Sequence, residues 1–239
     1  FAQVEEDLQQ VNLTRFNLQF PEKRTFFLEG QGIFAFGEQG GDVPTLFFSR
    51  QIGLGGGQPV PVIAGARVTG KAGPFDLGLL NIQTGNKASA GAVATNFSAV
   101  RVRRDILRRS SVGLLMTGRT ATGAGLQDNL AYGVDGTFGF FQSLSINTYW
   151  ARTKTPGLHG DDTSYRAQMN YSADRYGAQL ERLTVGDNFL PAVGFVRRDN
   201  ATENSDGASH ARTAASFDRT YRITFRFEGG HAHDVTCED

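Results

Sequence analysis

Leu130 to Phe140 reads LAYGVDGTFGF, and this stretch decides the fold class. Its even positions carry Leu, Tyr, Val, Gly, Phe and Phe, whereas its odd positions carry Ala, Gly, Asp, Thr and Gly. Successive side chains of a strand point to opposite faces, so this alternation predicts a strand with one apolar, aromatic face and one small, polar face. Such strands belong to antiparallel sheets and not to parallel sheets buried on both sides.

The same alternation recurs between about Val60 and Arg198. It predicts further strands near residues 100–103, 143–151, 164–171 and 176–181. The connections alternate in length. Short ones are expected near 71–73, 104–109, 141–142 and 172–174, and long ones over 83–95, 118–128 and 153–163. One hairpin plus one long loop repeats after roughly 33 residues. Each repeat therefore contains two strands, whereas a propeller blade needs four.

Short turns at one end and long loops at the other are typical of outer-membrane barrels. Aromatic residues are expected near the strand ends, where interfacial girdles lie in such barrels. They are Tyr132, Phe138, Phe140, Trp150, Tyr165, Tyr171 and Tyr176. We therefore predict an all-β, antiparallel up-and-down transmembrane β-barrel, incomplete in this chain. Aromatic strand ends also occur in soluble β-sandwiches, which stay the alternative fold.

Composition narrows the function classes. The chain has 30 Gly and 19 Phe but only 2 Met among 239 residues, which favours strands and turns over helices. Lys plus Arg number 24 and Asp plus Glu also number 24. The chain therefore lacks the excess of positive charge that would favour nucleic acid as a partner. The longest aliphatic run is Val112 to Met116, far short of a transmembrane helix. The single cysteine, Cys237, cannot form an internal disulfide.

Residues 1–55 differ from the hairpins of residues 56–198. Phe16 to Phe36 is rich in phenylalanine, charge and bends, so we predict an irregular, plug-like segment inside or beneath the sheet. The opening at Phe1, without methionine or a signal peptide, is interpreted as a truncation. Residues 199–239 are expected to be a divergent or poorly ordered tail, with one strand near Tyr221 to Phe227.

Three long motifs resemble a known bacterial family. They are NLTRF (12–16), FPEKRTFFLEG (20–30) and FFSRQIG (47–53), and the similarity continues to VGFVRR (193–198). The family comprises carbohydrate-binding family 9 domain-containing proteins, and this chain resembles their C-terminal domain of unknown function. The motif residues expected to be structural are Asn12, Arg15, Pro21, Glu22, Lys23, Arg24, Glu29, Gly30 and Arg50.

The resemblance implies an exported protein with an upstream carbohydrate-binding sandwich and an outer-membrane-type barrel. It implies no reaction and no cofactor. Localisation in the bacterial outer membrane is therefore expected. The expected partners are outer-membrane lipid and a polysaccharide or small anionic solute, with a role in glycan or solute binding, docking or uptake.

The polar face of the strands would line a lumen, and its residues are the candidate binding residues. They are Arg67, Arg101, Arg103, Asp135, Asn147, Arg166, Gln168, Asn170, Gln179 and Glu181. Arg101, Arg103, Arg104, Arg108 and Arg109 form the one basic cluster, the last three on a turn. A charged lining could select anions. The interpretation we favour is that these arginines pair with Asp76, Asp135 or Glu181, because confined charges need partners.

A secreted carbohydrate-active hydrolase is the alternative from another class. It would need two carboxylates flanking a bond, such as Glu22 with Glu29 or Asp161 with Asp162. The first pair is more simply a salt-bridged corner involving Lys23. No Gly-x-Ser-x-Gly elbow accompanies His159.

Two further motifs are interpreted as structural. The glycine run 53–57 is predicted to be a turn, because no helix pattern follows it to bind phosphate. His231, His233, Cys237 and Asp239 fit no zinc spacing and are predicted to lie in a disordered tail, so no metal site is expected.

Overall fold

The computed structural model describes residues 21–37, 43–55, 58–121, 127–173 and 177–196, and the backbone alone of 176, 201–210, 222–228 and 231–238. Asn12, Arg15 and the first residues of the predicted plug-like segment lie outside this part. The described residues confirm an all-β fold whose helices are single turns.

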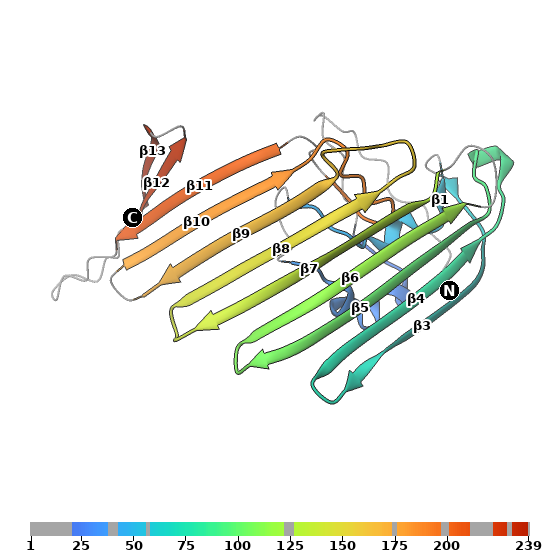
Figure 1. Cartoon of the computed structure of the whole chain (residues 1–239), viewed down its shortest axis with the longest axis horizontal. Helices are drawn as coiled ribbons and strands as arrows, with labels where there is room; N and C mark the ends of the chain where they lie inside the picture. The colour runs from blue at the N-terminus through green and yellow to red at the C-terminus, as the bar shows by residue number, and fades with distance from the viewer. Residues whose placement is uncertain are drawn as a thin grey trace.

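Nine antiparallel strands form one large sheet, in the order of the chain from β3 to β11 (Figure 1). They are β3 (Val62–Ala72), β4 (Phe75–Thr84), β5 (Thr95–Leu107), β6 (Ser110–Ala121), β7 (Asn129–Phe140), β8 (Leu144–Lys154), β9 (Thr163–Ser172), β10 (Tyr176–Val185) and β11 (Ala201–His210). Each strand pairs with its neighbour in the sequence, so the up-and-down topology is confirmed. The sheet is open, because β3 and β11 do not pair with each other.

Connections of alternating length join these strands, as the sequence predicted. Two-residue turns such as Arg108–Arg109 connect strands at one end of the sheet, whereas long loops such as residues 85–94 and 155–162 connect them at the other end. We call these sides the short-turn end and the long-loop end. One detail is corrected: β5 continues to Leu107, so Arg104 lies within a strand and not on the turn.

The smaller elements lie before and after the sheet. The first are α1 (Thr25–Leu28), η1 (Gln31–Phe34), η2 (Ser49–Gln51), β1 (Leu54–Gly55) and β2 (Gln58–Pro59), and η3 (Ala88–Ala90) follows β4. Beyond residue 200 the backbone forms β11, β12 (Arg222–Glu228) and β13 (His231–Glu238), where alternation had predicted one strand. Residues His231 to Cys237, expected in a disordered tail, are part of β13.

The two faces of the sheet differ sharply in burial. Along β4, Asp76, Gly78, Leu80, Ile82 and Thr84 are buried, and the residues between them are mostly exposed. The same alternation along β5 to β9 assigns most small and polar residues to the buried face, together with Phe97, Leu115 and Tyr149. We call this the inner face and the opposite one the outer face.

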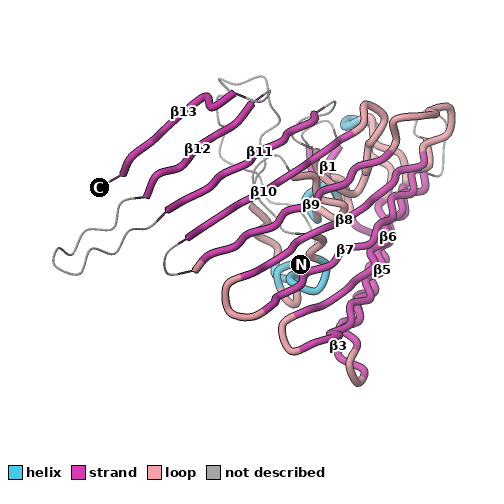
Figure 2. The backbone as a smooth tube through the Cα atoms, turned by 60° about the vertical axis from the view of Figure 1, so that its left-hand side comes forward, coloured by secondary structure: helices cyan, strands magenta, loops and turns pink. Residues whose placement is uncertain are grey.

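The N-terminal segment, defined as residues 21–37 and 43–55, covers part of the inner face. Its single-turn helices lie on the concave side of the curved sheet (Figure 2). Its Phe27, Phe34, Phe36, Leu46 and Ile52 form one core with sheet residues, among them Ile82 and Leu115. The loop after β10 adds Phe189 and Val193, and the backbone N–H of Phe48 donates to the carbonyl of Val193 at 2.7 Å. The described part of this segment therefore packs against the inner face of the sheet.

Candidate functional site

Glycines on the inner face make room for the N-terminal segment. A Cβ atom added to Gly78 would lie 2.7 Å from Ile33 and 3.1 Å from the ring of Phe34. One added to Gly133 would lie 2.7 Å from the ring of Phe36. Real Cβ atoms do not approach so closely, so these bulky side chains fit only because the strands lack side chains there.

A buried ion pair anchors this contact. Arg101 on β5 binds Asp135 on β7 with both terminal nitrogens, one of them at 2.8 Å, and its side chain is 2% exposed. The Oδ2 atom of Asp135, which binds Arg101, also accepts the backbone N–H of Gly37 at 3.2 Å. The guanidinium also lies 5.8 Å from the ring of Phe36. Asp135 therefore connects the sheet to the segment that covers it.

The remaining charged candidates of the inner face are also paired. Arg103 binds Asp76 at 2.7 Å and Arg166 binds Glu181 at 2.6 Å. Arg67 binds the Glu29 carboxylate at 2.7 Å and the carbonyl oxygens of Phe26 and Glu29. Of the five arginines in the basic cluster, Arg101 and Arg103 form the expected pairs with Asp135 and Asp76, whereas Glu181 pairs with Arg166, which lies outside the cluster.

Beyond the N-terminal segment, part of the inner face is solvent-accessible and polar. Adjacent positions of β8, β9 and β10 form two rows, with Asn147 beside Gln168 and Glu181 in one, and Ser145 beside Asn170 and Gln179 in the other. Asn170 and Gln179 are exposed, and the other four are half-buried. We call these six residues the polar patch. The structure thus divides the candidate binding residues into a covered, ion-paired group and this patch.

The motif residues form a compact structure inside the N-terminal segment. The side chain of Glu22 is 1% exposed and binds Arg24 through both oxygens, at 2.8 and 2.7 Å, while the Ser49 hydroxyl donates to it. Arg24 also donates to the carbonyls of Ser49 and Ile52. The salt-bridged corner predicted here exists, with Arg24 as the ion-pair partner of Glu22.

Burial alone would raise the pKa of Glu22, but hydrogen bonds from Arg24 and Ser49 outweigh it and lower that pKa below its ordinary value of 4.5. Burial also lowers the pKa of Arg50, whose guanidinium donates to the Pro21 carbonyl at 3.3 Å. Gly30, the residue before η1, has a positive φ of 67°, a conformation that glycine adopts without strain. These motif residues stabilise the shape of the segment.

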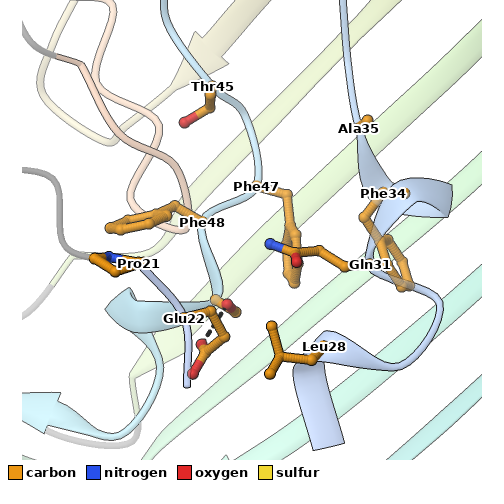
Figure 3. Close-up of a pocket in the computed structure, with 11 residues that line it drawn as sticks. Pro21, Glu22, Leu28, Gln31, Phe34, Ala35, Thr45, Phe47 and Phe48 are labelled. Carbon is orange, nitrogen blue, oxygen red and sulfur yellow. Dashed lines mark hydrogen bonds between the residues drawn. The ribbon is translucent and has the colours of Figure 1, made fainter. Parts of the chain in front are cut away.

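A cavity of about 680 Å³ lies within the same segment (Figure 3). Phe34, Phe47 and Phe48 line it together with Glu22 and Gln31. The carboxylate of Glu22 already holds Arg24 and Ser49, so it is committed to the fold of the segment.

The outer face carries the large apolar side chains. Leu77, Val102, Leu114, Val134, Trp150 and Tyr165 lie side by side in one row across β4 to β9. Val134 is 49% exposed, whereas Leu115 on the inner face is fully buried. Within the described residues, no second layer covers this face. A shallow groove of about 530 Å³, lined by Phe75, Leu114, Val134, Phe138 and Trp150 among others, hollows it.

The carboxylates proposed for a hydrolase have separate partners. Glu22 binds Arg24, whereas Glu29 is exposed and binds Arg67. Asp162 binds Arg152 at 3.0 Å, and the backbone carbonyl of Asp161 accepts the N–H of Asn188. His159 contributes its carbonyl to a hydrogen bond from Asn188.

The structure describes the two motifs interpreted as structural only in part. Gly53 has a φ of 82° and precedes the β1–β2 hairpin, which fits the predicted turn. No group of His, Cys, Asp and Glu side chains suited to a metal occurs among the described residues, and the side chains of His231, His233, Cys237 and Asp239 lie outside them. None of the helices described is long and apolar enough to cross a membrane.

Comparison with known families gives one match. A family model described as "Domain of unknown function (DUF5916)" matches residues 1–65. This supports an uncharacterised domain at the N-terminal end, over a shorter range than the resemblance to Arg198 had predicted. The match gives neither outer-membrane character nor a carbohydrate-binding neighbour. No curated protein and no solved structure matches the chain.

Sequence reasoning missed the glycines that receive the N-terminal segment. Gly78 and Gly133 lie on the polar face of otherwise regular strands. The alternating pattern identifies them there only as small residues. A glycine inside a strand often marks close approach of another part of the chain, and this was the available signal.

Proposed function

We propose that this chain forms part of the wall of an outer-membrane β-barrel, with the N-terminal segment as an internal plug and the polar patch facing a water-filled lumen. The observation that carries the proposal is the exposed apolar outer face, opposite an inner face that holds the core. A soluble sheet of this kind would bury its large apolar side chains.

Strand dimensions support this environment. Strands β3 to β10 contain 10 to 13 residues, and a tilted membrane strand needs about 9 to 11. On β7 the outer face stays apolar or aromatic from Leu130 to Phe140. That distance is about 34 Å of strand, or about 24 Å across a bilayer at a 45° tilt, close to the ~25 Å apolar band of outer-membrane barrels.

The side chains at both ends of the apolar outer face also support a position in a membrane. Phe138 and Phe140 stack near the short-turn end, and Tyr132 contacts Trp150 edge-on nearer the long-loop end. Arg104 lies 5.2 Å from the ring of Phe75. Aromatic and long basic side chains at the edges of an apolar band suit the boundary between hydrocarbon and water.

The single tryptophan, Trp150, provides the test. The full chain is reconstituted into vesicles containing lipids brominated on their acyl chains, which quench tryptophan on contact. We expect strong quenching of Trp150. The control exchanges two neighbours, Tyr149→Trp with Trp150→Tyr, which moves the indole to the inner face and should remove most quenching. Equal quenching of both proteins, or of neither, would contradict a lipid-facing outer surface.

The polar patch is proposed to contact a neutral, hydroxyl-rich solute such as a glycan, because amides and hydroxyls both donate and accept hydrogen bonds. Asn170→Ala with Gln179→Ala should abolish signals of the full chain on a glycan array. The matched control is Asn81→Ala with Gln83→Ala, which removes the same residue types from the outer face, where both side chains bond to Asn96. Equal loss in both variants would rule out the patch as the contact surface.

A further inference from the structure

We propose that the groove on the outer face binds one anionic lipid, whose acyl chain lies in the groove and whose headgroup phosphate is bound by Arg104. The proposal rests on the lipid-facing outer surface proposed above and deepens it by naming a lipid class and a position. It follows from the shape of the groove, from the charge that lines it and from the direction in which it crosses the sheet.

The middle of the groove is formed by small residues. Neighbouring positions in one row across β4 to β8 line the groove of about 530 Å³: Phe75, Arg104, Val112, Gly136 and Thr148. The next row, toward the long-loop end, supplies Val102, Leu114, Val134 and Trp150. A Cβ atom added to Gly136 would lie 2.7 Å from the ring of Phe138, which also lines the groove. Any side chain at Gly136 would displace this ring, so the glycine preserves the shape of the groove.

Arg104 supplies the charge of the groove. Among the lining residues Asp135 is also charged, but its carboxylate lies on the inner face, bound to Arg101. Arg104 is exposed, and its guanidinium lies 5.2 Å from the ring of Phe75. It forms no ion pair with any described residue. A guanidinium can bind a phosphate through two parallel hydrogen bonds, so an anionic headgroup complements this end of the groove.

The direction of the groove suits an acyl chain. Phe75 begins β4 at the short-turn end, whereas Thr148 lies in the interior of β8, so the row moves away from the short-turn end as it crosses the sheet. Paired strands lie about 4.8 Å apart, which gives the groove a length of about 14 Å from Arg104 to Thr148. Membrane strands are tilted by about 45°, so a groove at right angles to them is inclined by a similar angle. A chain lying in it therefore extends into the hydrocarbon layer while its phosphate stays beside Arg104.

Trp150 lines the groove and is the single tryptophan of the chain, so its fluorescence reports which lipid lies there. The full chain is reconstituted in phosphatidylcholine vesicles in which a rising fraction of the lipid is phosphatidylglycerol with brominated acyl chains. Quenching of Trp150, compared with quenching by brominated phosphatidylcholine, gives the affinity of the anionic lipid relative to the zwitterionic one. We expect a preference of about fivefold for phosphatidylglycerol, the size that one cation near a lipid surface contributes.

Two pairs of variants test the charge and the shape of the groove separately. Arg104→Gln should remove the preference, whereas Lys154→Gln, which removes an exposed cation at the long-loop end of the outer face, should keep it. Val112→Phe fills the middle of the groove and should remove most of the preference. Its control is Leu79→Phe, which places an aromatic ring on the exposed outer face of β4 away from the groove and should leave the preference unchanged.

Two results overturn the site. One is a preference that persists in Arg104→Gln or is lost equally in Lys154→Gln; the other is an equal response of Val112→Phe and Leu79→Phe. Quenching by brominated phosphatidylcholine is measured on every variant, which shows that each has inserted into the vesicles. If that lipid quenches Trp150 but phosphatidylglycerol is not preferred, only the anionic-lipid site fails. If neither lipid quenches Trp150, the lipid-facing surface fails and the site fails with it.

Discussion

Val134 and Asp135 are neighbours on β7 and belong to two different environments. Val134 lies on the outer face, half exposed, in a row of large apolar side chains. Asp135 lies on the inner face, bound to a buried arginine and to the backbone of the N-terminal segment. A similar contrast recurs along the sheet: the outer face exposes large apolar side chains, whereas the inner face combines buried ion pairs and glycines with the core that includes Ile82 and Leu115.

This contrast separates two sources of stability. The inner face is stabilised by contacts within the chain, which exist in any solvent: ion pairs, phenylalanine rings over glycines, and the core that includes Leu115. The outer face makes few contacts within the chain, so its contribution depends on the surrounding medium. Substitutions on one strand but opposite faces should therefore respond differently to lipid.

The largest effect is expected from Asp135→Ala. It leaves the guanidinium of Arg101 buried without a carboxylate, which costs about 3 to 5 kcal/mol in the free energy of unfolding. Denaturant titration of the full chain in detergent measures it. Val134→Ala, one residue away, should cost much less. Combining Asp135→Ala with Arg101→Met should recover part of the loss, and a Val134→Ala variant as unstable as Asp135→Ala would refute the contrast.

A charge placed on the outer face comes next. Val134→Arg should cost about 2 to 4 kcal/mol in lipid bilayers if this position lies near the midplane, because a charge there is poorly solvated. Thr137→Arg, on the exposed part of the inner face of the same strand, should cost little in the same bilayers. Urea titrations of both variants in vesicles test this. Equal tolerance of the two arginines would show that the outer face meets water.

The sequence predicted the arrangement of strands well and the covering of the sheet poorly. Side-chain alternation depends only on strand geometry, so Leu130 to Phe140 was enough to assign faces. The alternation of turn lengths could also be read directly from the sequence. Side-chain alternation could not show which face is covered, because the strands of a sandwich and of a barrel share the same period of two. The exposed outer face of the structure supplies that information.

For the site, the pairing of charges on the strands was predictable, and the contacts of the N-terminal segment were not. Arg101 and Asp135 are 34 residues apart, and their pairing followed from the expectation that confined charges need partners. The choice of Arg24 over Lys23 for Glu22 depends on Ser49 and Ile52, which fold back from a distant turn.

A smaller effect is expected where the N-terminal segment meets the sheet. Gly78→Ala brings a methyl group to within 2.7 Å of Ile33, so the segment must shift at a cost of about 1 to 3 kcal/mol. Gly70→Ala on β3 has no heavy atom within 4 Å of the added Cβ and should be neutral. Limited proteolysis near Ile33, together with denaturant titration, measures the difference. Equal cleavage of both variants would contradict the tight fit of the segment.

The smallest effect concerns the Glu22, Arg24 and Ser49 contacts, and it depends on pH. Because the folded pKa of Glu22 lies below its ordinary value of 4.5, its ionised form adds stability that is complete above that value. This stability is lost as the pH falls through the lowered pKa.

Ser49→Ala removes one hydrogen bond to the carboxylate and should cost about 1 kcal/mol at pH 7. The cost should shrink towards pH 3, where Glu22 becomes protonated in the unfolded chain and then in the folded one. Unfolding free energies of the two proteins between pH 7 and 3 test this, with Glu22→Gln as the variant that should remove this part of the pH dependence. A Ser49→Ala cost that stays constant over the whole range would mean that Ser49 stabilises the segment independently of the charge on Glu22.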